Sequence, residues 1–415
     1  MERNREPQPD LSVVRADFEG QPRVQLKFVD AGSLYLTWRW EHAPSQPRAI
    51  AMPRELVQPA LDELDDAVPS PAGGEDVRSA LQRAFAGPLG DPEREAALSS
   101  KLAQTLIPFA LAAEVNHLLE RGLRPHLRVQ VSPSLGRVPW EALLVDEGRR
   151  MVHEADVSML PPAGVRNAIG RKVSAYDPAG VVVAVLDPKV PGGMLGRVLR
   201  EGADSPVAEL VRRLGERRRG ADPAIGGSIG RGRLRGLLED ADRLLYVGHV
   251  SSARHGLDVR LHLSDGADIP GRAEPIGAHR PLAASDLAFG SNDEGPWRMP
   301  ARVALIACES GGDQRFAEPV GLVSAMVRHG AEHVTATRWT LPTDDGLSAV
   351  AGIDEPVFAS TVSAIDHAQE QPEPILALAA WQRDQAERWA ATGSNAHSPL
   401  MWGAFTATWA PAPGQ

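Results

Sequence analysis

The chain has 415 residues, of which 43% are hydrophobic and 24% are charged, and its formal net charge is −10. A chain of this length and apolar content is expected to bury a sizeable core in globular domains. The negative charge disfavours bulk binding of nucleic acid or of anionic membranes, and the sequence has neither an apolar leader nor a run of about 18 apolar residues, so neither a secretory signal nor a membrane span is predicted.

The first part of the chain, residues 1–90, predicts a small accessory region. Residues 23–29 and 34–40 alternate between apolar and polar side chains with a period of two, and a turn-forming segment separates them. This is the pattern of a β-hairpin. Residues 53–90 predict helices that proline and glycine interrupt. We therefore expect a hairpin followed by helices ahead of the main domain.

A long apolar-periodic segment at 93–120 predicts a helix that ends at Gly122, a residue suited to a helix C-cap. Pro108 lies inside this segment, so a kink or a break into two helices is expected. The segment opens the second predicted domain, which covers residues 91–415.

From residue 127 onward, apolar runs alternate with helical patterns. The predicted strands are 127–131, 181–186, 244–248, 302–307 and 333–337. The predicted helices are 205–218, 318–329 and 374–391. Several runs are continuously Val, Ile, Leu and Ala, as in strands buried on both faces. The sequence therefore predicts an α/β fold in which helices cover both faces of a mostly parallel sheet.

Residues 188–236 are unusually rich in arginine and glycine. Glycine-rich loops can cradle phosphates, but no Gly-Lys-Ser/Thr sequence ends this one and no strand runs directly into it. We expect a flexible surface loop that is open to proteolytic nicking. A weaker alternative is an arginine-rich segment that binds nucleic acid in a signalling complex, with residues 211–236 as its contact.

Two predicted strands end on residues that can perform nucleophilic chemistry. Residues 244–248 precede His249, and residues 302–307 precede Cys308, the only cysteine in the chain. The C-terminal ends of parallel strands meet at one edge of a sheet, so the imidazole and the thiol are expected close together. An imidazolium next to a thiolate lowers the cysteine pKa. The pair predicts a Cys-His dyad, although each residue alone could be structural.

The segments Leu245–His249 and Ala304–Gly311 resemble the histidine and cysteine motifs of CHAT-domain peptidases, which are caspase-like and related to separases, caspases and metacaspases. Other segments that resemble this family are 137–143, 182–188, 263–266, 281–287, 321–326, 330–339 and 399–405. The resemblance spans residues 95–410. It implies a caspase-like three-layer α/β/α fold and a cysteine endopeptidase that needs neither cofactor nor metal.

The resemblance also implies a biological setting. We expect a protein substrate, a separate activator or sensor protein, no membrane partner, and a role in bacterial defence or regulated cell death. A single cysteine permits no internal disulfide, so the reducing cytoplasm is the expected compartment. No His-Glu-x-x-His sequence is present, and no metal site is expected.

One departure from the family concerns the predicted oxyanion and substrate site. The family places glycine directly after the histidine, whereas this chain has Val250. Valine keeps the N–H donor, but its branched side chain is expected to crowd the scissile carbonyl. Glu309 and Asp313, beside the cysteine, could receive a basic P1 side chain or could be solvated turn residues, and Gly311 would let a substrate backbone approach closely. Asp344 could contact substrate or cap the next helix. The alternative function is a catalytically inactive CHAT-fold interaction module.

Three other histidines have structural interpretations. His255 and His262 are expected to face solvent or to line a hairpin. His329 and Gly330 are expected to end a helix, with the glycine at the position that needs a positive φ.

Overall fold

The structure is a computed structural model, and it describes all residues except 1–10, 73, 194, 201–204, 217–224, 252–254, 292–294, 309–320 and 413–415. The strands are β1 Arg23–Ala31, β2 Ser33–Trp40, β3 Arg48–Met52, β4 His126–Gln130, β5 Leu144–Asp146, β6 Arg149–Arg150, β7 Asp156–Met159, β8 Val182–Leu186, β9 Arg243–Val247, β10 Val250–Ser251, β11 Arg260–Leu261, β12 Leu282–Ala283, β13 Arg302–Ile306, β14 His333–Thr337 and β15 Phe405–Trp409. The helices are α1 Arg54–Ala67, α2 Val77–Ala86, α3 Pro92–Leu106, α4 Phe109–Glu120, α5 Met151–Glu154, α6 Ala163–Arg166, α7 Pro206–Glu216, α8 Arg231–Leu238, α9 Ala284–Phe289, α10 Leu322–Arg328, α11 Asp344–Ala351, α12 Val357–Glu370, α13 Pro374–Thr392 and α14 Pro399–Trp402.

A single ten-stranded sheet forms the centre of the molecule, in the order β3-β2-β1-β4-β7-β15-β14-β13-β9-β8. Six of the neighbouring pairs are parallel. Three are antiparallel, and they are β1–β2, β2–β3 and β14–β15. The sheet is therefore mostly parallel, as predicted. Strand direction reverses between β14 and β15, so β8, β9, β13 and β14 end together at one edge.

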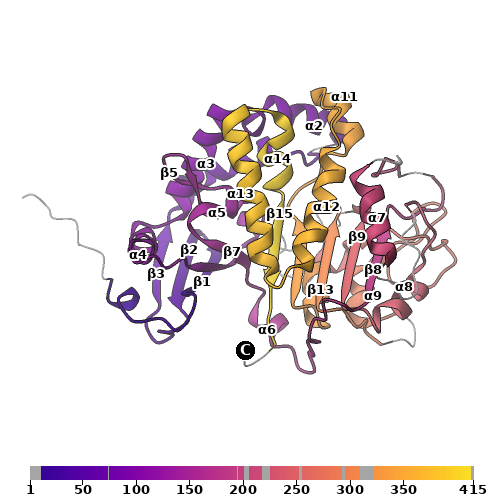
Figure 1. The fold of residues 1–415 in the computed structure, drawn as a ribbon, viewed down its shortest axis with the longest axis horizontal. Helices are drawn as coiled ribbons and strands as arrows, with labels where there is room; N and C mark the ends of the chain where they lie inside the picture. The colour runs from indigo at the N-terminus through magenta and orange to yellow at the C-terminus, as the bar shows by residue number, and fades with distance from the viewer. Residues whose placement is uncertain are drawn as a thin grey trace, which may run out of the picture.

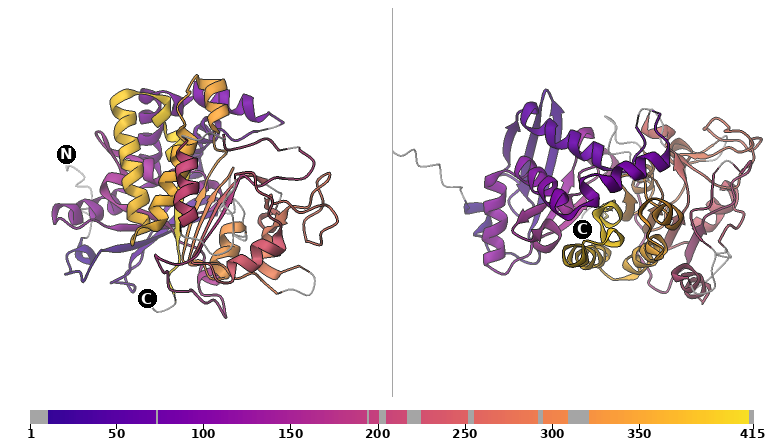
Figure 2. Two further views of the ribbon diagram at one scale, coloured as in Figure 1. Left: turned by 45° about the vertical axis from the view of Figure 1, so that its right-hand side comes forward. Right: turned by 90° about the horizontal axis from the view of Figure 1, so that it is seen from above.

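Helices cover both faces of this sheet (Figure 1, Figure 2). Side chains alternate along β13, because Ala304 and Ile306 pack in a cluster with residues of α12, and Val303 and Leu305 pack in a second cluster with residues of α8, α9 and α10. Since successive side chains of a strand point to opposite faces, an uninterrupted apolar run is what a strand between two helical layers requires. The predicted three-layer α/β/α architecture is confirmed.

The predicted hairpin is formed by β1 and β2, which pair antiparallel from Val24–Trp40 to Ala31–Ser33. β1 also pairs in parallel with β4, so the hairpin extends the central sheet. Trp38 and Trp40 donate indole N–H bonds to the buried Glu114 carboxylate on α4, at 3.0 and 2.8 Å. The region before residue 90 is thus continuous with the sheet of the remaining chain, and the predicted division at residue 90 stays a prediction.

Pro108 breaks the predicted long helix into α3 and α4, which are bent by 104°. Gly122 follows α4 with a φ of +73°, as its predicted C-cap role requires. Among the described residues no single helix is long and apolar enough to cross a membrane, and the bent α3–α4 pair passes that test only by its combined length and composition.

Part of the expected flexible loop at 188–236 is a helix in the structure. α8 begins at Arg231, and Arg231, Leu234 and Leu238 are buried against the rest of the fold. The expectation of a surface loop is therefore wrong at this end of the segment, because leucines spaced by three and four residues give the short helix an apolar face. Residues 217–224, within the same segment, lie outside the described residues.

Candidate active site

The register of two neighbouring strands brings the predicted dyad to one edge of the sheet. β13 and β9 pair in parallel, with Ile306 opposite Val247. The ladder continues one step further, where the Gly248 N–H donates to the Ile306 carbonyl at 3.2 Å. His249 and Cys308 each lie two residues beyond the Val247–Ile306 pair. Since adjacent strands are about 4.8 Å apart, the two strand ends that carry these residues lie side by side, and both residues are partly exposed.

The ring of His249 is held by a backbone carbonyl. Its Nε2 lies 2.7 Å from the carbonyl oxygen of Gly196. A carbonyl oxygen only accepts hydrogen bonds, so Nε2 must carry the proton. In the neutral ring Nδ1 is then the atom with a lone pair. The arrangement leaves His249 ready to accept a proton at Nδ1.

The loop that supplies the Gly196 carbonyl is anchored by Asp187, the residue that follows β8. Its Oδ2 accepts the N–H of Val198 at 3.1 Å and of Leu199 at 3.3 Å, and Arg197 Nε lies 3.3 Å away. Asp187 is 2% exposed and has a φ of +50°. Burial raises the pKa of its carboxyl, and these donors oppose that rise. Asp187 therefore fixes the path of the loop that orients His249.

Tyr246 and Gly248 support the His249 backbone from below. The buried Tyr246 hydroxyl lies 2.9 Å from the His249 carbonyl and 2.8 Å from the His262 carbonyl, both of which can accept its proton. A Cβ on Gly248 would meet this hydroxyl at 2.7 Å and Pro188 at 3.2 Å. Only glycine fits there without moving the tyrosine, so the close approach explains the glycine before the histidine.

His262 is buried at the end of the β10–β11 hairpin, so of its two expected placements it lines a hairpin and does not face solvent. Its Nδ1 lies 2.9 Å from Nε2 of His279, and its Nε2 lies 2.9 Å from the Ser251 hydroxyl. Burial, with smaller contributions from the neighbouring His279 and His249, lowers the pKa of His262 to about 3. His255 is exposed, as expected. His262 thus belongs to a neutral polar network behind the dyad.

The other predicted site residues divide into three groups. Glu309, Gly311 and Asp313 lie outside the described residues. Val250 begins β10 opposite Leu261, and its side chain is 8% exposed and packs in the apolar cluster of α8 and α9. Asp344 is buried, and its oxygens accept the N–H groups of Phe358 and Ala359 at 2.8 and 3.2 Å. The carboxylate of Asp344 therefore caps α12, whereas α11, which begins at Asp344, is capped by Thr343.

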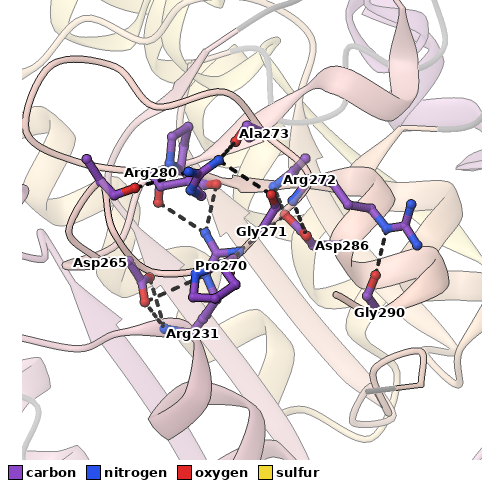
Figure 3. A network of polar contacts seen from close by, with 12 residues as sticks. Arg231, Asp265, Pro270, Gly271, Arg272, Ala273, Arg280, Asp286 and Gly290 are labelled. Atoms are coloured by element: carbon purple, nitrogen blue, oxygen red, sulfur yellow. Dashed lines mark hydrogen bonds and ion pairs between the residues drawn. The ribbon is translucent and has the colours of Figure 1, made fainter. Parts of the chain in front are cut away.

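The segment between the histidine and cysteine motifs is tied to α8 by a polar network (Figure 3). Arg231 lies between two buried carboxylates, with Nε 3.6 Å from Asp265 and Nη1 3.5 Å from Asp286. It also donates to the carbonyls of Pro270, Arg280 and Pro281 at 3.0–3.1 Å. The aspartates of the Ser-Asp motifs at 264–265 and 285–286 thus bind Arg231 and stabilise the fold of the segment between the histidine and cysteine motifs.

His329 and Gly330 end α10 as predicted. His329 is the C-cap residue, and Gly330 has a φ of +127°. A Cβ on Gly330 would lie 2.9 Å from the carbonyl oxygens of Lys172 and Met299. The His-Gly pair at this position is therefore a helix terminus and has no part in the candidate dyad.

Sequence reasoning assigned no role to Asp187, Gly196 or Tyr246. Asp187 was visible only as the acidic end of a strand motif, and Gly196 as one glycine among many. The roles of Asp187 and Gly196 depend on a loop that folds against His249, and Gly196 lies 53 positions from that histidine in the sequence. Tyr246 precedes the histidine by three residues, on the strand that delivers it, which was the one local signal available.

Comparison with protein families gives one match that covers most of the chain. The model of the CHAT domain matches residues 96–409. A search of curated proteins found no match.

Solved structures with a similar arrangement include separase from Saccharomyces cerevisiae in complex with securin, with a TM-score of 0.47 and 10% identity. The match covers 94% of this chain and 30% of the separase chain. The Arg-specific cysteine proteinase gingipain R is similar with a TM-score of 0.41 and 8% identity, over 74% of this chain and 69% of that one. Both TM-scores are below 0.5, so neither likeness bears on the chemistry of this chain.

Proposed function

The chain belongs to the CHAT domain family, and from that premise we propose that it is a caspase-like cysteine endopeptidase with His249 and Cys308 as its dyad. The observation that carries this proposal is the shared register of β9 and β13, which end at the same edge of the sheet. The Gly196 carbonyl bound to His249 Nε2 supports it, since it leaves Nδ1 as the proton acceptor.

In this mechanism His249 takes the thiol proton of Cys308, and the thiolate attacks the carbonyl carbon of a peptide bond. Backbone N–H groups at the strand ends stabilise the oxyanion. Collapse of the intermediate breaks the C–N bond, and the imidazolium gives its proton to the departing amine. Water, deprotonated by His249, then attacks the thioester, which releases the acid product and restores the thiol. These steps use groups of the chain and of water alone.

The proposed setting follows from the same family resemblance. The substrate is a specific partner protein in the cytoplasm, and a separate activator or sensor protein starts cleavage. The role is bacterial defence or regulated cell death. A chain that cleaves at full rate in isolation would remove the need for the activator.

A catalytically inactive interaction module is the second candidate, and Val250 in place of the family's glycine is the observation that favours it. Cleavage-site proteomics on host lysate separates the two candidates. New N-termini that require wild type and vanish with Cys308→Ala establish the peptidase. Silence from both, with cleavage gained by Val250→Gly, places the defect at the oxyanion position.

A second experiment tests the dyad without a known substrate. Cys308 is the only cysteine, so alkylation by iodoacetamide reports on this thiol alone. The pH dependence of the alkylation rate gives the thiol pKa, which is expected below the ordinary value of about 8.5. His249→Gln should return it to that value, and His255→Gln, an exposed neighbour in sequence, should leave it unchanged. A wild-type pKa of 8.5 or above would contradict the proposed dyad.

A further inference from the structure

A second concave site lies at the opposite edge of the sheet from Cys308 and His249. Trp409, the last residue of β15, pairs with His333, the first residue of β14, and His333 pairs with Arg302, the first residue of β13. The chain after Trp409 lines a cavity of about 250 Å³ together with parts of β1, β2 and β4. This cavity is separated from the candidate dyad by the full length of the strands.

Positive charge dominates the described lining of this cavity. Arg39, Arg128 and Arg166 line it from β2, β4 and the end of α6, and Glu41 is the carboxylate among them. The amides of Gln25 and Asn167 supply neutral polar groups. Three guanidinium groups against one carboxylate leave a net positive charge in a partly enclosed space.

Glu41 is already engaged by one of these arginines. Arg128, which is 4% exposed, donates from Nη1 to Glu41 at 2.7 Å and lies over the Trp409 ring at 4.5 Å. Gln25 donates to the same Glu41 oxygen at 2.8 Å. The carboxylate therefore neutralises the buried Arg128 and leaves Arg39 and Arg166 without a matching negative charge.

Arg166 differs from the other two arginines of this cavity. No hydrogen bond or ion pair among the described residues involves its guanidinium, and its Nε is buried without an acceptor. Burial lowers the pKa of Arg166, and the positive charges of Arg128 and Arg39 lower it further. Gathering cations in a partly desolvated pocket is unfavourable unless an anion completes the site.

We propose that this cavity, between Arg39, Arg128 and Arg166, binds the phosphoryl group of a small soluble ligand. Guanidinium forks donate paired N–H bonds to phosphate oxygens, and the Gln25 and Asn167 amides can add donors. The volume falls below the range of about 300–1,000 Å³ that is usual for drug-sized ligands, so the bound group is small. This proposal does not depend on whether the Cys308–His249 dyad is catalytically active.

The test is isothermal titration of the full chain with inorganic pyrophosphate at constant ionic strength. Wild type is expected to bind, and Arg166→Gln is expected to weaken binding about tenfold or more, since a charge-assisted hydrogen bond is lost. Arg78→Gln removes an exposed arginine on α2, outside the cavity, and should leave the affinity unchanged. Because the Arg166 side chain has no partner among the described residues, its variant should fold like wild type.

Glu41→Gln is expected to have the opposite effect on the affinity for pyrophosphate. It removes the carboxylate that faces the anion, so pyrophosphate should bind more tightly, and thermal unfolding checks that the variant is folded. Absence of pyrophosphate binding to wild type, or equal loss with Arg166→Gln and Arg78→Gln, would overturn the proposal. Tighter binding of a short oligonucleotide than of pyrophosphate, lost in Arg166→Gln, would also overturn the proposal. The ligand would then be a polyanion and not a small phosphoryl compound.

Discussion

The Nε2 atom of His249 lies 2.7 Å from the carbonyl oxygen of Gly196, although the two residues are 53 positions apart. The bond fixes both the orientation and the tautomer of the ring. Gly196 belongs to a surface loop. The carboxylate of Asp187 holds this loop by accepting the N–H groups of Val198 and Leu199. The orientation and the tautomer of His249 therefore depend on Asp187, the residue that follows the neighbouring strand β8.

Asp187→Ala is expected to reduce the reactivity of Cys308. Without the carboxylate, the N–H groups of Val198 and Leu199 lose their acceptor and the Gly196 carbonyl is no longer held against His249. The thiol pKa should rise toward about 8.5, and alkylation near pH 7 should slow roughly tenfold. The pH profile of alkylation is the measurement.

Asp187→Asn is the matched variant, because its amide oxygen can still accept the two N–H bonds. It should retain most of the reactivity, and both variants should stay folded by circular dichroism. If Asp187→Ala leaves the thiol pKa of folded protein unchanged, the loop does not orient the histidine.

Val250→Ala tests whether the valine side chain belongs to the core. The side chain packs in an apolar cluster and is 8% exposed, so truncation should cost about 2 kcal/mol of unfolding free energy. The alkylation rate of Cys308 should not change. Val77→Ala, at a 53% exposed position on α2, should change stability by less than about 0.5 kcal/mol. A faster alkylation with unchanged stability would show that Val250 crowds the thiol instead.

The sequence predicted the strands that carry the dyad because β9 and β13 are buried on both faces and read as unbroken apolar runs. It did not predict β7 or β15, since Asp156–Met159 and Phe405–Trp409 mix polar and apolar residues and are buried by pairing with distant strands. α12 was missed as well, because its β-branched and serine residues are weak helix formers. Pairing and loop paths are non-local, so Asp187 and Gly196 could not be assigned from periodicity.

Arg231→Met is expected to destabilise the fold strongly. Two buried carboxylates, Asp265 and Asp286, lose their shared cation, and three carbonyls lose a donor. Leaving buried charges unpaired costs about 3–5 kcal/mol. Chemical denaturation measures the change.

Arg233→Met on the same helix is the control, because Arg233 is exposed. Arg233→Met should leave the free energy of unfolding almost unchanged. Equal stability of the two variants would mean that water satisfies Asp265 and Asp286, and that the network in Figure 3 is not required for the segment between the two motifs.

Buried neutral histidines should make the fold sensitive to acid. Burial lowers the pKa of His262 to about 3 and that of His126 to about 4, from an ordinary value near 6.5. In the unfolded chain both protonate near pH 6.5, while the folded chain resists protonation until much lower pH. The unfolded state then binds more protons, so stability is full above pH 6.5 and falls as the pH drops toward the folded pKa values.

Each such histidine should cost about 1.4 kcal/mol of unfolding free energy for every pH unit well below 6.5. Urea denaturation between pH 7 and pH 5 measures this slope. His262→Gln keeps polar contacts to Ser251 and His279 but cannot protonate, so the difference between its slope and that of wild type isolates His262 from the carboxylates. His255→Gln, at an exposed position, should reproduce the wild-type slope. Identical slopes for all three proteins would mean that His262 is already protonated in the folded chain at pH 5.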